Sequence, residues 1–296
     1  MNIFGVCLWF DDQAEDAFAF YQTVFKNVKK LRSTNYSEVN AKMANRSTDS
    51  LMALEMQIDG LDIMLLNGGP IFKPNPSISL HISCRTVAEC DELFAKLAVG
   101  GEVLMPLDNY PFSEKFGWVN DKYGVSWRVN VDESKQKLTP CMMFQGDDNG
   151  KAEKAMQHYT SIFENSKIVA VHKFQEGEGG PVGLVKHAVF DLNGEQFMAF
   201  DSPIKHAFDF NEGVSLIVNC KTQEEIDKFW AELCEGGKPS HCGWLVDKFG
   251  VSWQVVPTVL IEMMQGKDQA RCGNMMSALL GMSKLDIAAL TAAYNR

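Results

Sequence analysis

The sequence lacks the features that mark three common classes of protein. Its 296 residues include eight cysteines but no Cys-x-x-Cys pair, which argues against a disulfide scaffold and against a zinc ribbon. The amino-terminal residues contain neither a basic segment nor a long apolar one, and no stretch reaches the roughly 18 uncharged apolar residues of a membrane span. We therefore expect a soluble, cytoplasmic protein with reduced thiols.

Positive charge is also scarce. The chain has 28 Lys and Arg against 38 Asp and Glu, and the resulting net charge of -10 repels phosphate backbones and anionic lipid surfaces. We therefore expect no nucleic-acid or membrane partner. Hydrophobic residues make up 46% of the chain and charged residues 22%, which is typical of globular proteins. At about 100 to 200 residues per domain, the length predicts two domains.

The chain contains an internal repeat. The segment GWVNDKYGVSWRV, which starts at Gly117, returns as GWLVDKFGVSWQV at Gly243 with nine identities in thirteen positions. The segment SLHISCRTVAECDELFAKL, which starts at Ser79, returns as SLIVNCKTQEEIDKFWAEL at Ser215 with eight identities in nineteen positions. The repeated segments keep their order, so the sequence is a tandem duplication. The polar stretch 132–139 separates the two halves.

Each half alternates between strand-like and helix-like patterns, and each predicts two β-α-β-β-β units. In the first unit the tight-turn dipeptide Asp59-Gly60 joins the last two strands. The expected strands of the first half are 3–10, 29–36, 50–58, 61–66 and 77–84, with three short ones near Glu102, Gly117 and Val125, and the expected helices are 12–25 and 86–97. Residues 258–296 are rich in Ala, Leu and Met and predict two or three further helices.

Three segments carry a resemblance to a known family: LWFDDQAEDAFAFYQTVF, CGWLVDKFGVSWQVVP and ALLGMSKLDIAALTAAY. Over nearly its whole length the chain resembles the vicinal oxygen chelate (glyoxalase/bleomycin-resistance) superfamily. It is most similar to the PhnB-like branch, which is often labelled 3-demethylubiquinone-9 3-methyltransferase-like. The resemblance implies an α+β fold with two glyoxalase-like domains of paired β-α-β-β-β units, at 1–132 and 139–257, and a helical extension at 258–296. Function is less constrained, because one scaffold can host several activities.

Metal-dependent members of that superfamily hold the metal with inward-facing His and Glu side chains. The corresponding positions in this chain are Val6, Ser79 and Arg128 in the first half and Pro140, Ser215 and Gln254 in the second. This set contains no His or Glu, and its members are poor ligands for Zn, Fe or Ni. Cys234, His241 and Cys242 lie close together, but their spacing matches no zinc loop and a turn-region His beside a thiol is the simpler interpretation. We expect no metal and no cofactor.

Two other patterns could indicate chemistry but have simpler explanations. The repeated segments Asp121–Gly124 and Asp247–Gly250 place an acid beside a base, yet Asp followed by Gly at this spacing is typical of a hairpin turn. The glycine-rich stretch 177–183 falls inside a run of strands and not at a strand-to-helix turn, where a nucleotide-like cofactor binds. We therefore do not expect methyl transfer from S-adenosylmethionine.

Strand alternation predicts a cleft with a mixed lining in the first half. Its expected inward face consists of Val6, Leu8, Phe10, Ser79, His81, Ser83, Ser126, Arg128 and Asn130. The alternate residues, among them Cys7, Trp9, Leu80, Ile82, Cys84, Trp127 and Val129, are expected to pack under the helices. The equivalent inward face of the second half has Met142, Phe144, Ser215, Ile217, Asn219, Ser252, Gln254 and Val256, which include no ionisable group.

His81 and Arg128 are the two ionisable groups expected in the first cleft. An imidazole beside a fixed cation has its neutral form favoured, so His81 is the candidate catalytic base, although it could equally be a hydrogen-bonded residue of the interior. Arg128 could bind a carboxylate or phosphonate, or could instead pair with Asp62 or Glu55. The predicted ligand-contacting residues are Phe10, Ser79, Arg128, Phe144, Ser215 and Gln254.

Two hypotheses for the function follow. In the first, the protein binds a small, partly apolar and anionic molecule without a metal. In the second, it is an enzyme that uses His81 and Arg128 for an isomerase- or lyase-type proton transfer. The absence of mapped metal ligands and of a paired nucleophile and base favours binding. A small molecule is the expected partner, and self-association is compatible with the duplication but not required by it.

Overall fold

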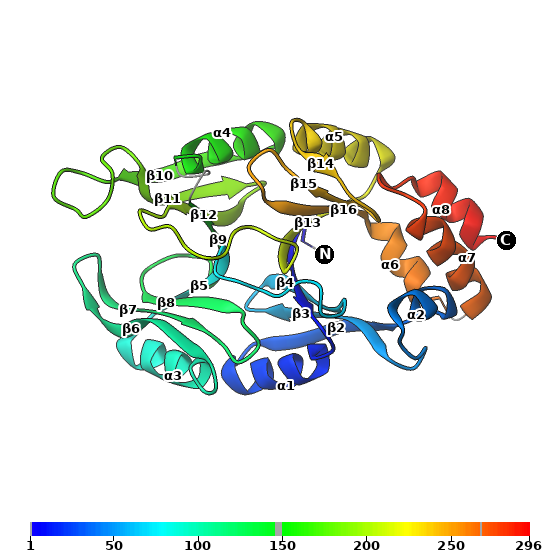
Figure 1. Ribbon diagram of the computed structural model, residues 1–296, viewed down its shortest axis with the longest axis horizontal. Helices are drawn as coiled ribbons and strands as arrows, with labels where there is room; N and C mark the ends of the chain where they lie inside the picture. The colour runs from blue at the N-terminus through cyan, green and yellow to red at the C-terminus, as the bar shows by residue number, and fades with distance from the viewer. Residues whose placement is uncertain (1, 146–149, 267) are drawn as a thin grey trace.

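The computed structural model describes residues 2–145, 150–266 and 268–296. Its helices and strands form four successive β-α-β-β-β units and a carboxy-terminal group of three helices, as expected from the sequence (Figure 1). The first unit contains β1 (Phe4–Phe10), α1 (Ala14–Val24), β2 (Val28–Asn35), α2 (Glu38–Ala44), β3 (Leu51–Ile58) and β4 (Leu61–Asn67). The second contains β5 (Ile78–Cys84), α3 (Val87–Leu97), β6 (Glu102–Tyr110), β7 (Ser113–Asn120) and β8 (Ser126–Val131).

The second half repeats this order. The third unit contains β9 (Leu138–Phe144), α4 (Ala152–Ile162), β10 (Lys167–Lys173), β11 (Val185–Leu192) and β12 (Glu195–Asp201). The fourth contains β13 (Val214–Cys220), α5 (Gln223–Cys234), β14 (Lys238–Pro239), β15 (Trp244–Val246) and β16 (Ser252–Pro257). The chain then forms α6 (Thr258–Met264), α7 (Gln269–Leu280) and α8 (Ile287–Tyr294). None of the described helices is long and apolar enough to cross a membrane.

Local sequence explains where these elements begin and turn. Helix α3 begins after Thr86, whose hydroxyl accepts a hydrogen bond from the Glu89 amide at 3.1 Å and so satisfies one free amide of the first turn. Strands β3 and β4 turn at Asp59 and Gly60, which have φ of 46° and 96°. Both angles lie in the left-handed region that an Asp-Gly hairpin favours, and the predicted turn is confirmed. Helix α2 was not expected from the sequence.

Each sheet combines one unit from each half of the chain. The first sheet, here called sheet A, has the order β14-β15-β16-β13-β1-β4-β3-β2, and the second, sheet B, has the order β10-β11-β12-β9-β5-β8-β7-β6. Strand β1 pairs antiparallel with β13, and β5 pairs antiparallel with β9. Strands β1 and β5, which were expected to line one cleft, therefore lie in different sheets. The duplicated halves are therefore consecutive in sequence, but each sheet contains strands from both halves.

Helices cover one face of each sheet, and the core lies between them. In Figure 1, α1 and α3 cover the lower units and α4 and α5 the upper ones. The alternate residues Leu80, Ile82, Cys84, Trp127 and Val129 are buried in this core, as expected. The opposite face of sheet A is covered by the carboxy-terminal helices, which pack through a second cluster that includes Leu260, Met263, Met276 and Leu279.

Candidate functional site

The candidate site lies on the face of sheet B that the helices leave free. On this face His81 of β5 stands beside Arg128 of β8, and Arg128 stands beside Trp118 of β7. On the other side of β5, Ser79 is paired with Cys141 of β9. The predicted residues Ser79, His81 and Arg128 are thus brought together, and the hairpin predicted at 121–124 places Trp118 beside Arg128, whereas Cys141 comes from a strand of the other half that was not expected beside Ser79.

Arg128 is held between two aromatic rings. Its guanidinium carbon lies 4.3 Å from the ring centroid of Trp118 and 4.0 Å from that of Phe200 in β12. The Trp118 ring is fixed in turn, because its indole N–H donates to the Ser126 hydroxyl at 2.7 Å. Stacking on two rings fixes the plane of the guanidinium and leaves its edge as the hydrogen-bonding direction.

The polar atoms around Arg128 are incompletely satisfied within the described part of the chain. The Nε of Arg128 and the Oγ of Ser79 are buried there without a hydrogen-bond partner. Arg128 is half-buried, and the buried part of its side chain lowers its pKa; burial also raises the pKa of the neighbouring Cys141 thiol. Cys141 is therefore a neutral thiol and not a nucleophile.

Neither acid expected to pair internally with Arg128 reaches it. Glu55 and Asp62 lie in sheet A, where Arg32 Nε donates to Glu55 at 2.6 Å and Gln57 Nε2 donates to Asp62 at 2.8 Å. The expected alternative of an internal ion pair with these residues is therefore wrong. The described residues supply Arg128 with aromatic contacts in place of a counter-ion.

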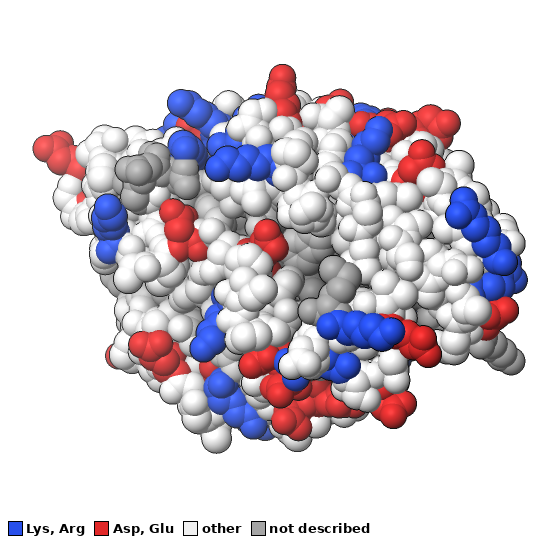
Figure 2. All heavy atoms as spheres, turned by 45° about the vertical axis from the view of Figure 1, so that its right-hand side comes forward, with Lys and Arg blue, Asp and Glu red and all other residues white. Residues whose placement is uncertain are grey.

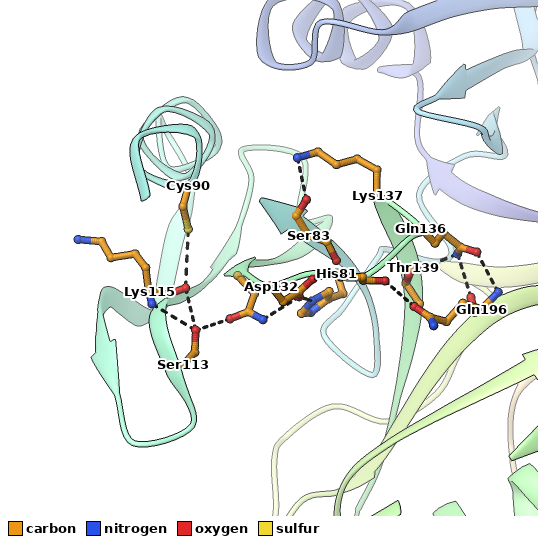
Figure 3. A network of polar contacts seen from close by, with 12 residues as sticks. His81, Ser83, Cys90, Ser113, Lys115, Asp132, Gln136, Lys137, Thr139 and Gln196 are labelled. Carbon is orange, nitrogen blue, oxygen red and sulfur yellow. Dashed lines mark hydrogen bonds and ion pairs between the residues drawn. The ribbon is translucent and has the colours of Figure 1, made fainter. Parts of the chain in front are cut away.

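His81 is bonded to Asp132, a residue that follows β8 (Figure 3). The His81 Nε2 and the Asp132 Oδ2 are 2.9 Å apart, and the same oxygen accepts from Asn130 Nδ2 at 2.8 Å. The Ser113 hydroxyl donates to Asn130 Oδ1 at 2.6 Å and fixes that amide. Burial favours a raised pKa of Asp132, but the hydrogen bond and charge of His81 outweigh it and hold that pKa well below its usual range. When Nε2 donates to this carboxylate, the Nδ1 of neutral His81 carries the free lone pair.

Sequence reasoning missed Asp132, because it falls in the polar stretch assigned to the boundary between halves. It also missed His187 of β11, whose proximity depends on a strand order that the sequence does not reveal. Burial, together with the neighbouring His81 and Arg128, lowers the pKa of His187 to about 4. A second imidazole thus faces the same cation and is neutral at physiological pH.

The corresponding face of sheet A holds two further predicted residues, Ser215 and Gln254. Gln254 of β16 donates from Nε2 to the Ser215 hydroxyl of β13 at 3.0 Å. Cys7 of β1 is paired with Ser215, and burial raises the pKa of its thiol to about 12. A cavity of about 230 Å³ lies over this face and is lined by Gln254, Ile217 and Trp244, among others. Ser215 and Gln254 therefore lie on a different sheet from Ser79 and Arg128.

The predicted orientation of two strands is wrong by one residue. Gly5 lines the sheet A cavity and is paired with Ile217, so Cys7 and Trp9 share its face, whereas Phe10 lies on the opposite face in the core. In β9, Cys141 faces Ser79, so Phe144 also lies on the core side, where its ring contacts Phe210. The structure therefore places Phe10 and Phe144 away from both clefts.

The same shift replaces Val6 and Pro140 with Cys7 and Cys141 at the positions mapped to superfamily metal ligands. These positions then hold Cys7, Ser215 and Gln254 in sheet A, and Cys141, Ser79 and Arg128 in sheet B. Two neutral thiols, two hydroxyls, an amide and a cation do not fit Zn, Fe or Ni. No three His, Cys, Asp or Glu side chains gather as a metal-binding group anywhere in the described ranges. The Cys242 thiol instead donates to the Leu279 carbonyl at 3.6 Å.

Solved structures of glyoxalase type share this fold. Glyoxalase I from Zea mays aligns with 88% of this chain and 94% of its own, with a TM-score of 0.57 and 12% sequence identity, a level that speaks for the fold alone. The PhnB protein from Bacillus cereus is 42% identical over 42% of this chain and 100% of its own, with a TM-score of 0.39. YjdN from Escherichia coli is 28% identical over 135 residues, which are 42% of this chain and 91% of YjdN.

A sequence model of one family matches both halves of the chain. The match covers residues 3–130 and again 136–256, which is most of the protein, and the family is described as 3-demethylubiquinone-9 3-methyltransferase. The two matched segments coincide with the repeat found in the sequence. Together with the sheet topology, they show that the chain is a tandem-duplicated member of the 3-demethylubiquinone-9 3-methyltransferase family, the PhnB-like branch of the vicinal oxygen chelate superfamily.

Proposed function

We propose that the protein is a metal-independent binding protein for a small, partly apolar, anionic molecule, which binds at Arg128 on the face of sheet B that the helices leave free. The observation that carries this proposal is the guanidinium stacked between Trp118 and Phe200 with its Nε unpaired within the described chain. A half-buried charge is partly removed from water, and this costs free energy unless a counter-charge accompanies it. A carboxylate or phosphonate can supply that counter-charge through two parallel hydrogen bonds.

The surroundings of Arg128 suit the rest of such a ligand. Trp118, Phe116 and Met143 form a buried apolar cluster on this face, with Phe200 and Phe208 packed against it. Ser79 adds an unpaired hydroxyl. An apolar body with one anionic end would place the body against the rings and the anion at Arg128. Clefts with an apolar lining and a few convergent polar groups are typical of small-molecule sites.

Titration calorimetry with benzoate and phenylphosphonate tests this proposal, with benzamide as the uncharged comparison. Wild type should bind the two anions and Arg128→Gln should lose that binding. Arg271→Gln is the matched control, because the Arg271 guanidinium also lies on an aromatic ring, 4.4 Å from the centroid of Tyr294, but in the carboxy-terminal helices. Binding that survives Arg128→Gln, or that Arg271→Gln also removes, would contradict the proposal.

The hydrogen bond between His81 and Asp132 favours an enzyme as the second candidate. A carboxylate that orients one ring nitrogen leaves the other free to accept a proton, which is the arrangement of a general base. In D₂O, an enzyme of this kind would exchange a carbon-bound proton of a bound carboxylate, and His81→Gln would abolish the exchange. Absence of exchange in wild type would contradict the enzyme hypothesis and leave binding as the only proposed function.

Methyl transfer is not part of the proposal, despite the family's description. Residues 177–183 lie in the loop between two strands, β10 and β11. The glycine-rich turn that binds nucleotide-like cofactors such as S-adenosylmethionine instead joins a strand to a helix. The proposed binding needs no cofactor and no second copy of the chain, since the cleft is formed by strands of one chain.

A further inference from the structure

A second cleft, over sheet A, is closed by the carboxy-terminal extension. Its floor consists of strand residues such as Met64, Leu66 and Ile217, and its roof of α6 and α7. The roof residues that line the cavity are Leu260, Ile261, Met264, Met276, Leu279 and Leu280. In Figure 1 these helices lie at the end of the molecule next to α2, beyond the repeated units. The duplication supplies the floor, and the extension supplies the roof.

The lining is mostly apolar and rich in methionine, and its polar members are Thr34, Asn40, Glu55, Asp62, Asn219 and Gln254. Met52, Met64, Met264 and Met276 all contribute, and Trp244 adds an indole ring. Methionine side chains are unbranched and polarisable, so they adapt to the shape of a ligand and make favourable contacts with aromatic rings. The cavity of about 230 Å³ exceeds the roughly 150 Å³ of an apolar cavity that holds benzene. One or two fused rings would fill it.

The charged groups of the lining are already satisfied. Glu55 is bonded by both Nε and Nη2 of Arg32, and Asp62 accepts from Gln57 Nε2 at 2.8 Å and from the Asn2 amide at 3.2 Å. The described residues that line the cavity include no Lys, Arg or His. An anion would therefore meet two carboxylates, and the one cation bound to them, Arg32, is already paired with Glu55, whereas Arg128 has no such partner in the described chain.

The two sheets differ in charge at equivalent positions of the repeat. Arg128 stands beside Trp118 in sheet B, and Gln254 stands beside Trp244 in sheet A. Gln254 offers an uncharged amide where sheet B offers a cation. On the face of the molecule seen in Figure 2, Lys and Arg side chains lie among Asp and Glu side chains.

We propose that the carboxy-terminal helices convert the cleft of sheet A into a second ligand site, specific for small uncharged aromatic molecules. The two sites would then divide ligands by charge: anions at Arg128, and neutral rings under α6 and α7. This site does not depend on the anion binding proposed for sheet B.

Indole, with indole-3-carboxylate as its anionic counterpart, is the probe. Protein labelled at the methionine methyl groups is titrated and followed by NMR. Indole should shift the resonances of Met64 and Met276 in the full-length protein, whereas indole-3-carboxylate should leave them unchanged. Failure of millimolar indole to shift these two resonances would overturn the proposal, as would equal shifts with the carboxylate.

Filling the cavity provides the second measurement. Met64→Trp adds a large side chain to the floor and should weaken indole binding at least tenfold. Met198→Trp is the matched control, because Met198 pairs with Cys141 in sheet B as Met64 pairs with Cys7 in sheet A. Undiminished affinity in Met64→Trp would overturn the proposal. If Met64→Trp does not fold, Ile217→Phe fills the same cavity and is judged by the same tenfold criterion.

The result is independent of the test at Arg128. Arg128→Gln should retain indole binding while losing the anions, and Met64→Trp should do the opposite. Failure of one site therefore leaves the evidence for the other intact.

Discussion

The Tyr21 hydroxyl donates a hydrogen bond to Asp121 Oδ2 at 2.9 Å, across the junction between the two sheets. Tyr21 lies on α1 of the first unit, whereas Asp121 lies in the β7–β8 turn of the second. The carboxylate also accepts from the Trp127 indole at 2.8 Å and from the amides of Tyr123 and Val125 at 2.9 and 3.1 Å. Asp121 therefore forms the predicted turn and also joins the helix of one unit to the turn of the next.

The second half reproduces this contact. The Tyr159 hydroxyl donates to Asp247 Oδ2 at 2.6 Å, and the Trp253 indole donates to the same oxygen at 2.8 Å. Burial raises the pKa of Asp121 and of Asp247, although these donors oppose that rise. The repeated Asp is therefore a structural residue in each half, and its neighbouring Lys is not an acid–base partner.

The first prediction concerns this contact. Tyr21→Phe removes one donor from a buried carboxylate and should lower the free energy of unfolding by about 1–3 kcal/mol. Tyr159→Phe should lower it by a similar amount, because the two contacts are equivalent. Urea unfolding of both variants measures the change. Tyr110→Phe is the control, since its hydroxyl donates to the Pro106 carbonyl at an exposed position. A loss in Tyr110→Phe as large as in Tyr21→Phe would contradict the assignment.

The sequence predicts the units better than their assembly. Alternation and turn residues identify β1, α1 and the Asp59-Gly60 hairpin, because the signals for these are local. The pairing of β1 with β13 joins residues about two hundred positions apart, and nothing local encodes it. The resemblance implied the fold, but the choice of partner units depends on the packing of complete units against each other.

The candidate site was predictable to the extent that strands were correctly oriented. In β5 the alternation of Ser79, His81 and Ser83 with apolar residues is clear, and their face is as expected. All seven residues of β9 are buried, so alternation there gives no signal and Phe144 was placed on the wrong face. Strand β1 is nearly as uniform, and Phe10 was misplaced for the same reason.

The second prediction is a pH dependence due to His187. Its pKa is about 4 in the folded protein against a usual 6.5, so the unfolded chain binds more protons between these values. The stability contributed by neutral His187 is therefore present above pH 6.5 and is lost as the pH falls towards 4. His187→Gln should flatten the stability profile in this window, measured by urea unfolding at each pH. His172→Gln, at the paired exposed position in β10, should not. An unchanged profile in His187→Gln would contradict the prediction.

The third prediction is that the purified protein carries no stoichiometric transition metal. The mapped positions offer thiols held neutral by burial, and such thiols must lose a proton to bind Zn²⁺. Elemental analysis after purification without chelators should find much less than one Zn, Ni, Fe or Mn per chain. About one metal per chain, lost on replacing Cys7 and Cys141 with Ala, would show that the ligand mapping is wrong.

The last prediction separates a ligand-binding from a structural role for Arg128. Breaking a buried ion pair costs about 3–5 kcal/mol, because the partner charge is left behind. Stacking on an aromatic ring contributes about 0.5–2 kcal/mol, and the described chain gives Arg128 two such contacts. Arg128→Gln also removes a half-buried charge, which offsets part of that loss.

The unliganded Arg128→Gln variant should therefore unfold with a free energy within about 2 kcal/mol of wild type. Because Gln254 occupies the equivalent position in sheet A, the replacement is one that this fold already accommodates. Saturating benzoate should stabilise wild type in proportion to the logarithm of its concentration above Kd, and should leave the variant unchanged. A loss of 3 kcal/mol or more without ligand would contradict the ligand-binding assignment, because the role of Arg128 would then be chiefly structural.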